Sequence, residues 1–177
     1  KNGGGIVITS PEEESVFVNT IFEYLTSPNI MISGLTGSIS IYDTKVFFKN
    51  CVFNKNKSED FLNLINSKYR INDSSFFNVF SDALDSDFSN GVITKTKFTN
   101  IGNDALDFSG SVTKLSEINI DKVRDKALSV GEISNISGEN IYIINAEIGI
   151  TSKDLSNVTI NKVKIVDTKL GFAVFKK

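Results

Sequence analysis

The sequence contains no histidine and no tryptophan, and only one cysteine and two prolines, in 177 residues. Without histidine the chain cannot form a Ser-His-Asp triad, an imidazole general base or a histidine-ligated zinc site. A single cysteine excludes an intramolecular disulfide and a thiolate metal cluster. No apolar run reaches the roughly 18 residues that a membrane-spanning helix needs. The sequence therefore excludes several common kinds of site, and it predicts no transmembrane segment.

An excess of charge of one sign is also lacking, because 19 Lys and Arg face 21 Asp and Glu, for a net charge of −2. Nucleic-acid-binding proteins favour basic surfaces, so we expect no nucleic-acid partner. Alanine is scarce, and no long segment has apolar residues at the helical spacing of three and four. Isoleucine and phenylalanine suit half-buried strands, whereas asparagine, serine, glycine and aspartate suit tight turns. This composition predicts an all-β domain.

A repeat of 22 residues runs through most of the chain. The sequence DALD at 82–85 returns as DALD at 104–107, and equal steps lead to 126–129, 148–151 and 170–173. Backward steps lead to 60–63 and 38–41. From residue 83 onward each step places Ala or Gly before a large apolar residue, which is in turn Leu84, Leu106, Leu128, Ile150 and Phe172. These apolar residues are predicted to point inward in one stack.

A period of this length with short strands in each unit is typical of a solenoid. Each unit reads as about three strands, and stacked units pair in parallel about 4.8 Å apart. The unit lacks the leucines and helical turn of a leucine-rich repeat and the six-residue rhythm of a left-handed hexapeptide helix. We therefore predict one right-handed parallel β-helix over residues 1–177, with about eight coils. Residues 1–37 would form N-terminal coils or a cap, and residues 38–177 the regular coils.

The chain ends just after a predicted repeat strand, and no cap is recognisable there. An open β-helix end exposes strand edges that invite pairing. We therefore expect a fragment of a longer protein, or contacts of the open ends with neighbouring domains or subunits. No signal peptide is visible.

Several segments resemble right-handed parallel β-helix repeat proteins of the pectin-lyase-like superfamily. They include SDALDSD at 81–87 and GNDALDFSGS at 102–111, together with residues 58–63, 125–132 and 149–156. The resemblance covers most of the chain. It implies a bacterial protein that is exported and lies outside the cell or on its surface, and it implies polysaccharide binding or chemistry. Because the superfamily also holds adhesins and inert stalks, fold does not dictate function.

The resulting expectation is a carbohydrate-associated β-helix module with a binding or scaffold role and a polysaccharide partner. The alternative is a polysaccharide lyase, epimerase or glycoside hydrolase that acts on an acidic glycan through an acidic outward face. Both interpretations stay open at the level of the sequence.

The repeat predicts where such a ligand would bind. If the large apolar residues point inward, the residues that follow them form one row on the solvent face. The predicted row comprises Asn63, Asp85, Asp107, Ser129 and Thr151. The carboxylates of Asp85 and Asp107 would be about 5 Å apart on adjacent coils. The predicted ligand-binding set is Asn63, Asp85, Asp87, Asp107, Ser129 and Lys153.

The acidic row has three interpretations. Paired carboxylates can act as acid and base on a glycosidic bond, and the catalytic candidates are then Asp85, Asp107, Lys126 and Arg124. No cofactor is required, but Asp85, Asp87 and Asp107 offer the hard oxygen ligands that calcium prefers. Alternatively, the side chains bond to backbone groups at turns and are neutralised by Lys126 and Lys153.

A comparison with enzymes of the superfamily weakens the catalytic interpretation. Polygalacturonase-like hydrolases place a histidine near three aspartates, and this chain has no histidine. Pectate lyase-like enzymes use a basic residue, often arginine, beside calcium-binding acids, and the only arginines here are Arg70 and Arg124. The Asp-Pro-His-Glu motif of alginate epimerase-like enzymes is missing. No catalytic set is complete, so the sequence does not decide whether the chain is an enzyme.

The remaining apolar side chains are assigned to the core. Cys51 is predicted to be buried. Most of ten phenylalanines are predicted to form inward stacks, namely Phe47, Phe48, Phe53, Phe61, Phe76, Phe77, Phe80, Phe88, Phe98 and Phe108.

Overall fold

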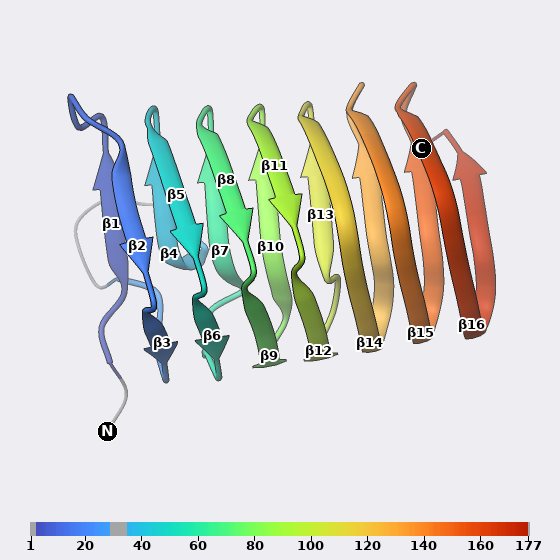
Figure 1. Ribbon diagram of the computed structural model, residues 1–177, viewed down its shortest axis with the longest axis horizontal. Helices are drawn as coiled ribbons and strands as arrows, with labels where there is room; N and C mark the ends of the chain where they lie inside the picture. Colours follow the sequence, from blue (N-terminus) through green and yellow to red (C-terminus); the bar gives the residue numbers. More distant parts are fainter. Residues whose placement is uncertain (1–2, 29–34, 177) are drawn as a thin grey trace.

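Residues 3–28 and 35–176 are described by the computed structural model, which shows a parallel β-solenoid. Every element of this part of the chain is a strand, and it contains no helix that could span a membrane. In Figure 1 the strands of one face run upward at the back and those of the next run downward at the front, while the chain advances from left to right. The all-β fold and its right-handed winding therefore agree with the prediction.

Each coil passes through three faces. The first face carries the predicted repeat and contains β1 (Ile6–Thr9), β4 (Gly37–Tyr42), β7 (Asp60–Ile65), β10 (Asp82–Asp87) and β13 (Leu106–Ser109). The second face contains β2 (Ser15–Val18), β5 (Lys45–Lys49), β8 (Lys68–Asn72) and β11 (Asn90–Thr94). The third face contains β3 (Ile21–Glu23), β6 (Val52–Asn54), β9 (Ser75–Val79) and β12 (Lys97–Ile101). Three long strands then bend through the second, third and first faces in turn: β14 (Val112–Gly131), β15 (Asn135–Lys153) and β16 (Asn157–Phe175).

The predicted register is confirmed along the regular coils. Leu84 pairs with Leu106, and the same column continues through Leu128 and Ile150. Leu84, Leu106 and Leu128 are at most 1 % exposed, so they form the inward stack that the repeat predicted. Phe172 continues the column in register, but it is 59 % exposed because β16 pairs only with β15 among the described strands.

The register departs from the predicted period in the first coils. Ile39, not Ser40, pairs with Leu62, so the predicted alignment of residues 38–41 with 60–63 is wrong by one residue. Ile6 pairs with Ile39, which is 33 positions further on, so the first coil is longer than the others. The chain therefore completes slightly fewer turns than the predicted eight. The predicted N-terminal segment 1–37 includes residues 1–2 and 29–34, which lie outside the described residues.

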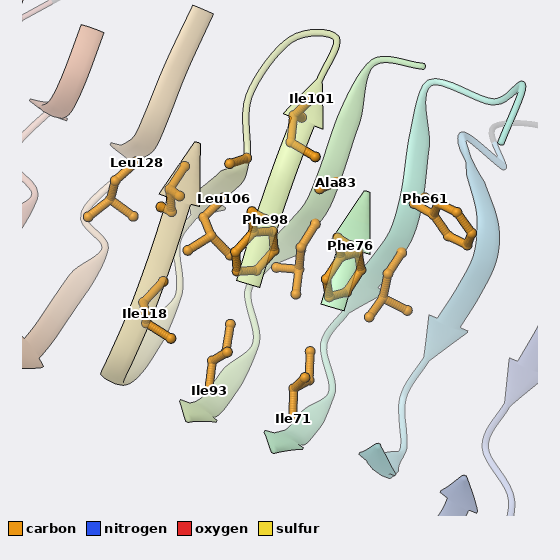
Figure 2. Close-up of a cluster of buried hydrophobic side chains, with 14 of the residues drawn as sticks. Phe61, Ile71, Phe76, Ala83, Ile93, Phe98, Ile101, Leu106, Ile118 and Leu128 are labelled. Carbon is orange, nitrogen blue, oxygen red and sulfur yellow. The ribbon is translucent and has the colours of Figure 1, made fainter. Parts of the chain in front are cut away.

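Aromatic side chains fill the interior between the faces. The rings of Phe53 and Phe76 stack with centroids 4.1 Å apart, and Phe98 continues the stack at 4.9 Å. Figure 2 shows the rings of Phe76 and Phe98 from this stack, together with Leu106 and Leu128 of the inward column. Cys51 is buried, as are most of the predicted phenylalanines: Phe48, Phe53, Phe61, Phe76, Phe98 and Phe108.

Four of the predicted core phenylalanines are not buried: Phe47 and Phe77 are half-buried, and Phe80 and Phe88 are on the surface. Phe80 is 67 % exposed and Phe88 is 62 % exposed, because each lies at a corner next to β10 and not within a strand. At these two corners the side chain points toward solvent, so neither ring joins the stack.

The corners explain the abundance of asparagine, aspartate and serine. Residues at the corners adopt positive φ, a conformation that asparagine, aspartate and glycine reach most easily. Examples are Asn50 at 51°, Asp73 at 50° and Gly110 at 61°. A buried serine follows four of the corners between the first and second faces, at Ser67, Ser89, Ser111 and Ser134. Its hydroxyl accepts a backbone N–H of the preceding coil, as Ser89 does from Ser67 at 2.9 Å.

Candidate functional site

The structure confirms the register of the predicted polar row on the first face and corrects its exposure. Asn63, Asp85, Asp107, Ser129 and Thr151 are successive register partners, and we call them the central row. The prediction that the whole row faces solvent is wrong, because Asn63 is 1 % exposed, and Ser129 and Thr151 are fully buried. Asp85 and Asp107 are half-buried. Strands about 4.8 Å apart let neighbouring side chains cover the short ones between them.

A second row of charged side chains lies at the N-terminal ends of the same strands. This edge row consists of Asp60, Asp82, Asp104 and Lys126. The Asp104 backbone N–H donates to Asp82 Oδ1 at 2.7 Å, and the Lys126 backbone N–H donates to Asp104 Oδ1 at 2.9 Å. Lys126 Nζ also lies 3.4 Å from Asp104 Oδ1 and contacts Asp125. Asp82 and Asp104 therefore match the structural interpretation, in which carboxylates satisfy backbone groups and a lysine balances them.

Three members of the central row, Asn63, Asp85 and Asp107, lack such backbone partners among the described residues. Asn63 Nδ2 donates to Asp85 Oδ2 at 3.1 Å, and no described backbone N–H is bonded to the side chain of Asp85 or Asp107. Within the described residues, the buried side-chain acceptors without any partner are Asp60 Oδ2, Asn63 Oδ1 and Asp107 Oδ1. All three lie on the first face around Asp85. Because an unsatisfied buried acceptor costs about 1–3 kcal/mol, this convergence calls for hydrogen-bond donors.

Burial also changes the protonation of these carboxyls. Burial raises the pKa of Asp85 to about 9, and the negative charges of Asp87 and Asp60 act in the same direction. Burial raises the pKa of Asp60 to about 7 and that of Asp104 to about 6. The pKa values of Asp82 and Asp87 are raised as well, again chiefly by burial. A protonated Asp85 has a single O–H, so it can satisfy at most one of the three unpartnered oxygens.

The predicted basic residues differ in their relation to the central row. Lys153 Nζ donates to Ser129 Oγ at 3.0 Å, and its Cε lies 2.8 Å from where a Cβ on Gly131 would be, so Gly131 gives the lysine its path. Lys126 belongs to the edge row. Although burial acts to lower the pKa of Lys126, its hydrogen bond to Asp125 raises it above the usual value, which does not favour a role as general base. Arg124 is exposed at an irregularity between the third and first faces.

The geometry gives the calcium prediction no support. Among residues 3–28 and 35–176, no group of three or more Asp, Glu or Cys residues is placed to hold a metal ion together. The predicted ligands Asp85, Asp87 and Asp107 share the first face without forming such a group.

Some residues of this face were not predicted from the sequence. Asp60 was aligned in the repeat but not assigned to the site, and it contributes one of the unpartnered oxygens. Phe80 and Phe88 flank β10 as exposed rings. The signal for Phe88 was present in the repeat, because its corner position is occupied by Asn66 one coil earlier and by Gly110 one coil later.

Comparisons with known proteins do not identify a family for this chain. No protein-family model matches the chain, and no curated protein matches it in sequence. Because one fold hosts many functions, the role of the protein has to be inferred from the chemistry of its first face.

Proposed function

We propose that this protein is a glycan-binding β-solenoid module that is exported or displayed on a cell surface, and that its ligand binds on the first face. The observation that carries the proposal is the set of three unpartnered buried acceptors around the half-buried Asp85. Sugar hydroxyls are hydrogen-bond donors, and they would supply what the central row lacks. The resemblance to the pectin-lyase-like superfamily supports the same class of ligand.

The shape of the first face suits an extended ligand. Parallel coils repeat equivalent groups about every 4.8 Å, so a polymer meets the same kind of side chain at each step. Phe80 and Phe88 add exposed aromatic rings on either side of β10, which can pack against the apolar faces of sugar rings.

The charge of the first face disfavours the acidic glycan of the alternative interpretation. The central and edge rows together with Asp87 hold carboxyls on three successive coils, whereas their cations are Lys126 and Lys153. Lys126 is paired with Asp104, and Lys153 is bonded to Ser129. A polyuronate would meet uncompensated negative charge on this face, so a glycan without acidic groups is the better ligand.

A glycan array containing neutral, amino and uronic-acid oligosaccharides tests the proposal. We expect wild-type protein to bind non-acidic glycans, and Asp107→Ala to weaken binding about tenfold, because one acceptor is removed. Glu13→Ala removes one negative charge from the exposed corner between β1 and β2, far from Asp107 in the repeat, and should bind like wild type. Absence of glycan binding by the wild type, or equal loss in both variants, would contradict the proposal.

A second candidate function is a glycoside hydrolase, and the raised pKa of Asp85 favours it. A carboxyl with a pKa of about 9 is protonated at neutral pH and could act as a general acid, with Asp107 as its register neighbour on the next coil. A reducing-end assay on the glycans that bind distinguishes the two roles. Turnover that Asp85→Asn abolishes without loss of the fold would replace the binding role with catalysis.

A further inference from the structure

On the first face, lysine ammonium groups lie beside the later coils. Among the described residues, none lies beside the earlier coils. In the coils that follow Asp107, Lys153 reaches the central row and donates to Ser129 Oγ at 3.0 Å. Lys126 lies 3.4 Å from Asp104 in the edge row. The earlier coils contain Asp60, Asn63 and Asp85. In the described part of the chain neither aspartate forms an ion pair with a lysine or arginine, and Asn63 is hydrogen-bonded to Asp85.

The unpartnered acceptors fall in and next to the half without ammonium groups. Asn63 is 1 % exposed and Asp60 is 3 % exposed, and each has a side-chain oxygen without a donor. Asn63 directs its amide toward Asp85 Oδ2, so its free oxygen lies beside the same carboxyl. Asp107, one coil further on, has the third such oxygen. Donors are therefore missing where negative charge is densest.

We propose that the glycan bound by the first face carries primary ammonium groups, as a polymer of unacetylated amino sugars does, and that these groups bind at Asp85 and Asp107. This inference rests on the proposed function. An ammonium group supplies three donors and a positive charge, which suits both the unpartnered oxygens and the crowded carboxyls. Lys153 shows that an ammonium group fits the central row, since it already occupies the row at Ser129.

Binding of an ammonium group should also release protons. In the free protein, burial and then the neighbouring carboxyls raise the pKa of Asp85 and favour its protonated form. A cation placed beside Asp85 favours the carboxylate, so the proton leaves when the ligand binds. A neutral sugar at the same position would not cause this release.

The experiment compares two ligands that differ only in the amine. We would titrate the protein with a hexamer of glucosamine and with a hexamer of N-acetylglucosamine, and measure both by calorimetry at pH 6 in two buffers of different ionisation enthalpy. We expect the amine hexamer to bind at least about tenfold more tightly and to release protons. Asp85→Asn should abolish the proton release, whereas Glu13→Gln should keep the wild-type affinity and release.

The outcomes separate this inference from the proposed function. Equal affinity for the two hexamers, or binding of other glycans only, would overturn the requirement for ammonium groups and leave glycan binding intact. Absence of binding to every glycan would overturn both. Spermidine serves as a further probe, because it carries amines without a sugar. If spermidine bound as tightly as the glucosamine hexamer, the site would be a polyamine site and the glycan assignment would be wrong.

Discussion

Asp82 and Asp85 lie three residues apart on β10, yet they differ in what surrounds their carboxyls. Asp82 accepts a backbone N–H from the next coil, whereas Asp85 accepts only the side-chain amide of Asn63. Burial raises the pKa of both carboxyls, and for Asp85, which also faces several other acids, it does so to about 9. At the scale of single residues, the partners within a few ångströms decide whether an aspartate is part of the scaffold or available to a ligand.

The first prediction concerns the pH dependence of stability. The pKa of Asp85 is about 9 in the folded protein, and that of an unfolded aspartate is about 3.9. The folded state therefore binds an additional proton between these values, so the stabilisation from this proton is complete below the unfolded pKa and is lost as the pH rises through the folded pKa. We expect the melting temperature to fall as the pH rises from about 5 to about 10.

Thermal melts of Asp85→Asn provide the test. This variant cannot ionise at that position, so the decline above about pH 7 should largely disappear, whereas the part below pH 7, to which Asp60 and Asp104 contribute, should remain. Glu13→Gln changes an exposed carboxyl and should retain the wild-type decline. A melting temperature that falls equally in wild type and Asp85→Asn would show that another group dominates.

At the scale of elements, a ladder of buried serines joins successive coils at the corner between the first and second faces. The backbone N–H of Ser67 donates to Ser89 Oγ, and that of Ser89 donates to Ser111 Oγ, both at 2.9 Å. The ladder continues through Ser134 to Ser156. Each hydroxyl satisfies a backbone group that the corner removes from the sheet, so the ladder stabilises the stacking of coils.

We predict that removal of one hydroxyl from this ladder destabilises the fold. Ser89→Ala leaves the backbone N–H of Ser67 without its acceptor, and we expect a loss of about 1–3 kcal/mol in the free energy of unfolding. Urea denaturation measures this change. Ser116→Ala removes a hydroxyl whose only bond is a long, exposed one to Glu139, and it should change stability by less than about 0.5 kcal/mol. Equal effects of the two substitutions would exclude a special role for the ladder.

At the scale of the whole molecule, the near-neutral net charge is the sum of an acidic first face and a basic second face. The first face carries the aspartates of β7, β10 and β13. The second face exposes lysines at Lys45, Lys68 and Lys114, together with Arg70, whose guanidinium stacks on Phe47 at 4.3 Å and pairs with Glu14 at 2.8 Å. Because the solenoid repeats each position in a straight column, modest local biases in sequence add up to faces of opposite charge.

The difference between inner strands and the last strand leads to a third prediction. In a solenoid each coil contacts only its neighbours, so local stability depends on whether a strand is paired on both sides. Among the described strands β13 has partners on both sides, whereas β16 pairs with β15 alone. Val174 on β16 is 83 % exposed, and Phe108 on β13 is fully buried. We expect backbone amides of residues 157–175 to exchange with deuterium sooner than those of residues 106–109.

Hydrogen exchange followed by mass spectrometry measures this difference in the complete chain. Protection that rises from residues 157–175 toward β13 would agree with stepwise opening from the C-terminal coil. Equal protection in β13 and β16 would indicate that the solenoid opens only as one cooperative unit, and the prediction would be wrong.

The sequence by itself determined the period, the inward column and the order of residues in the central row. Leu84, Leu106 and Leu128 could be placed because each coil buries the same position, so the spacing along the chain directly reports the stacking. The same logic placed Asp85 beside Asp107. It failed where the coils are irregular, as at Ile39, because there the register is set by pairing with the next strand and not by the period.

The tertiary structure decided which polar groups are buried and which have partners. The sequence predicted Ser129 on the surface. In the structure the side chain of Lys153 passes over Gly131 and covers Ser129. The sequence also could not separate Asp82, which bonds to the next coil, from Asp107, which has an unpartnered oxygen. Hydrogen bonds and pKa values depend on distances of a few ångströms and on local burial, and these exist only once all three faces of the coils have packed.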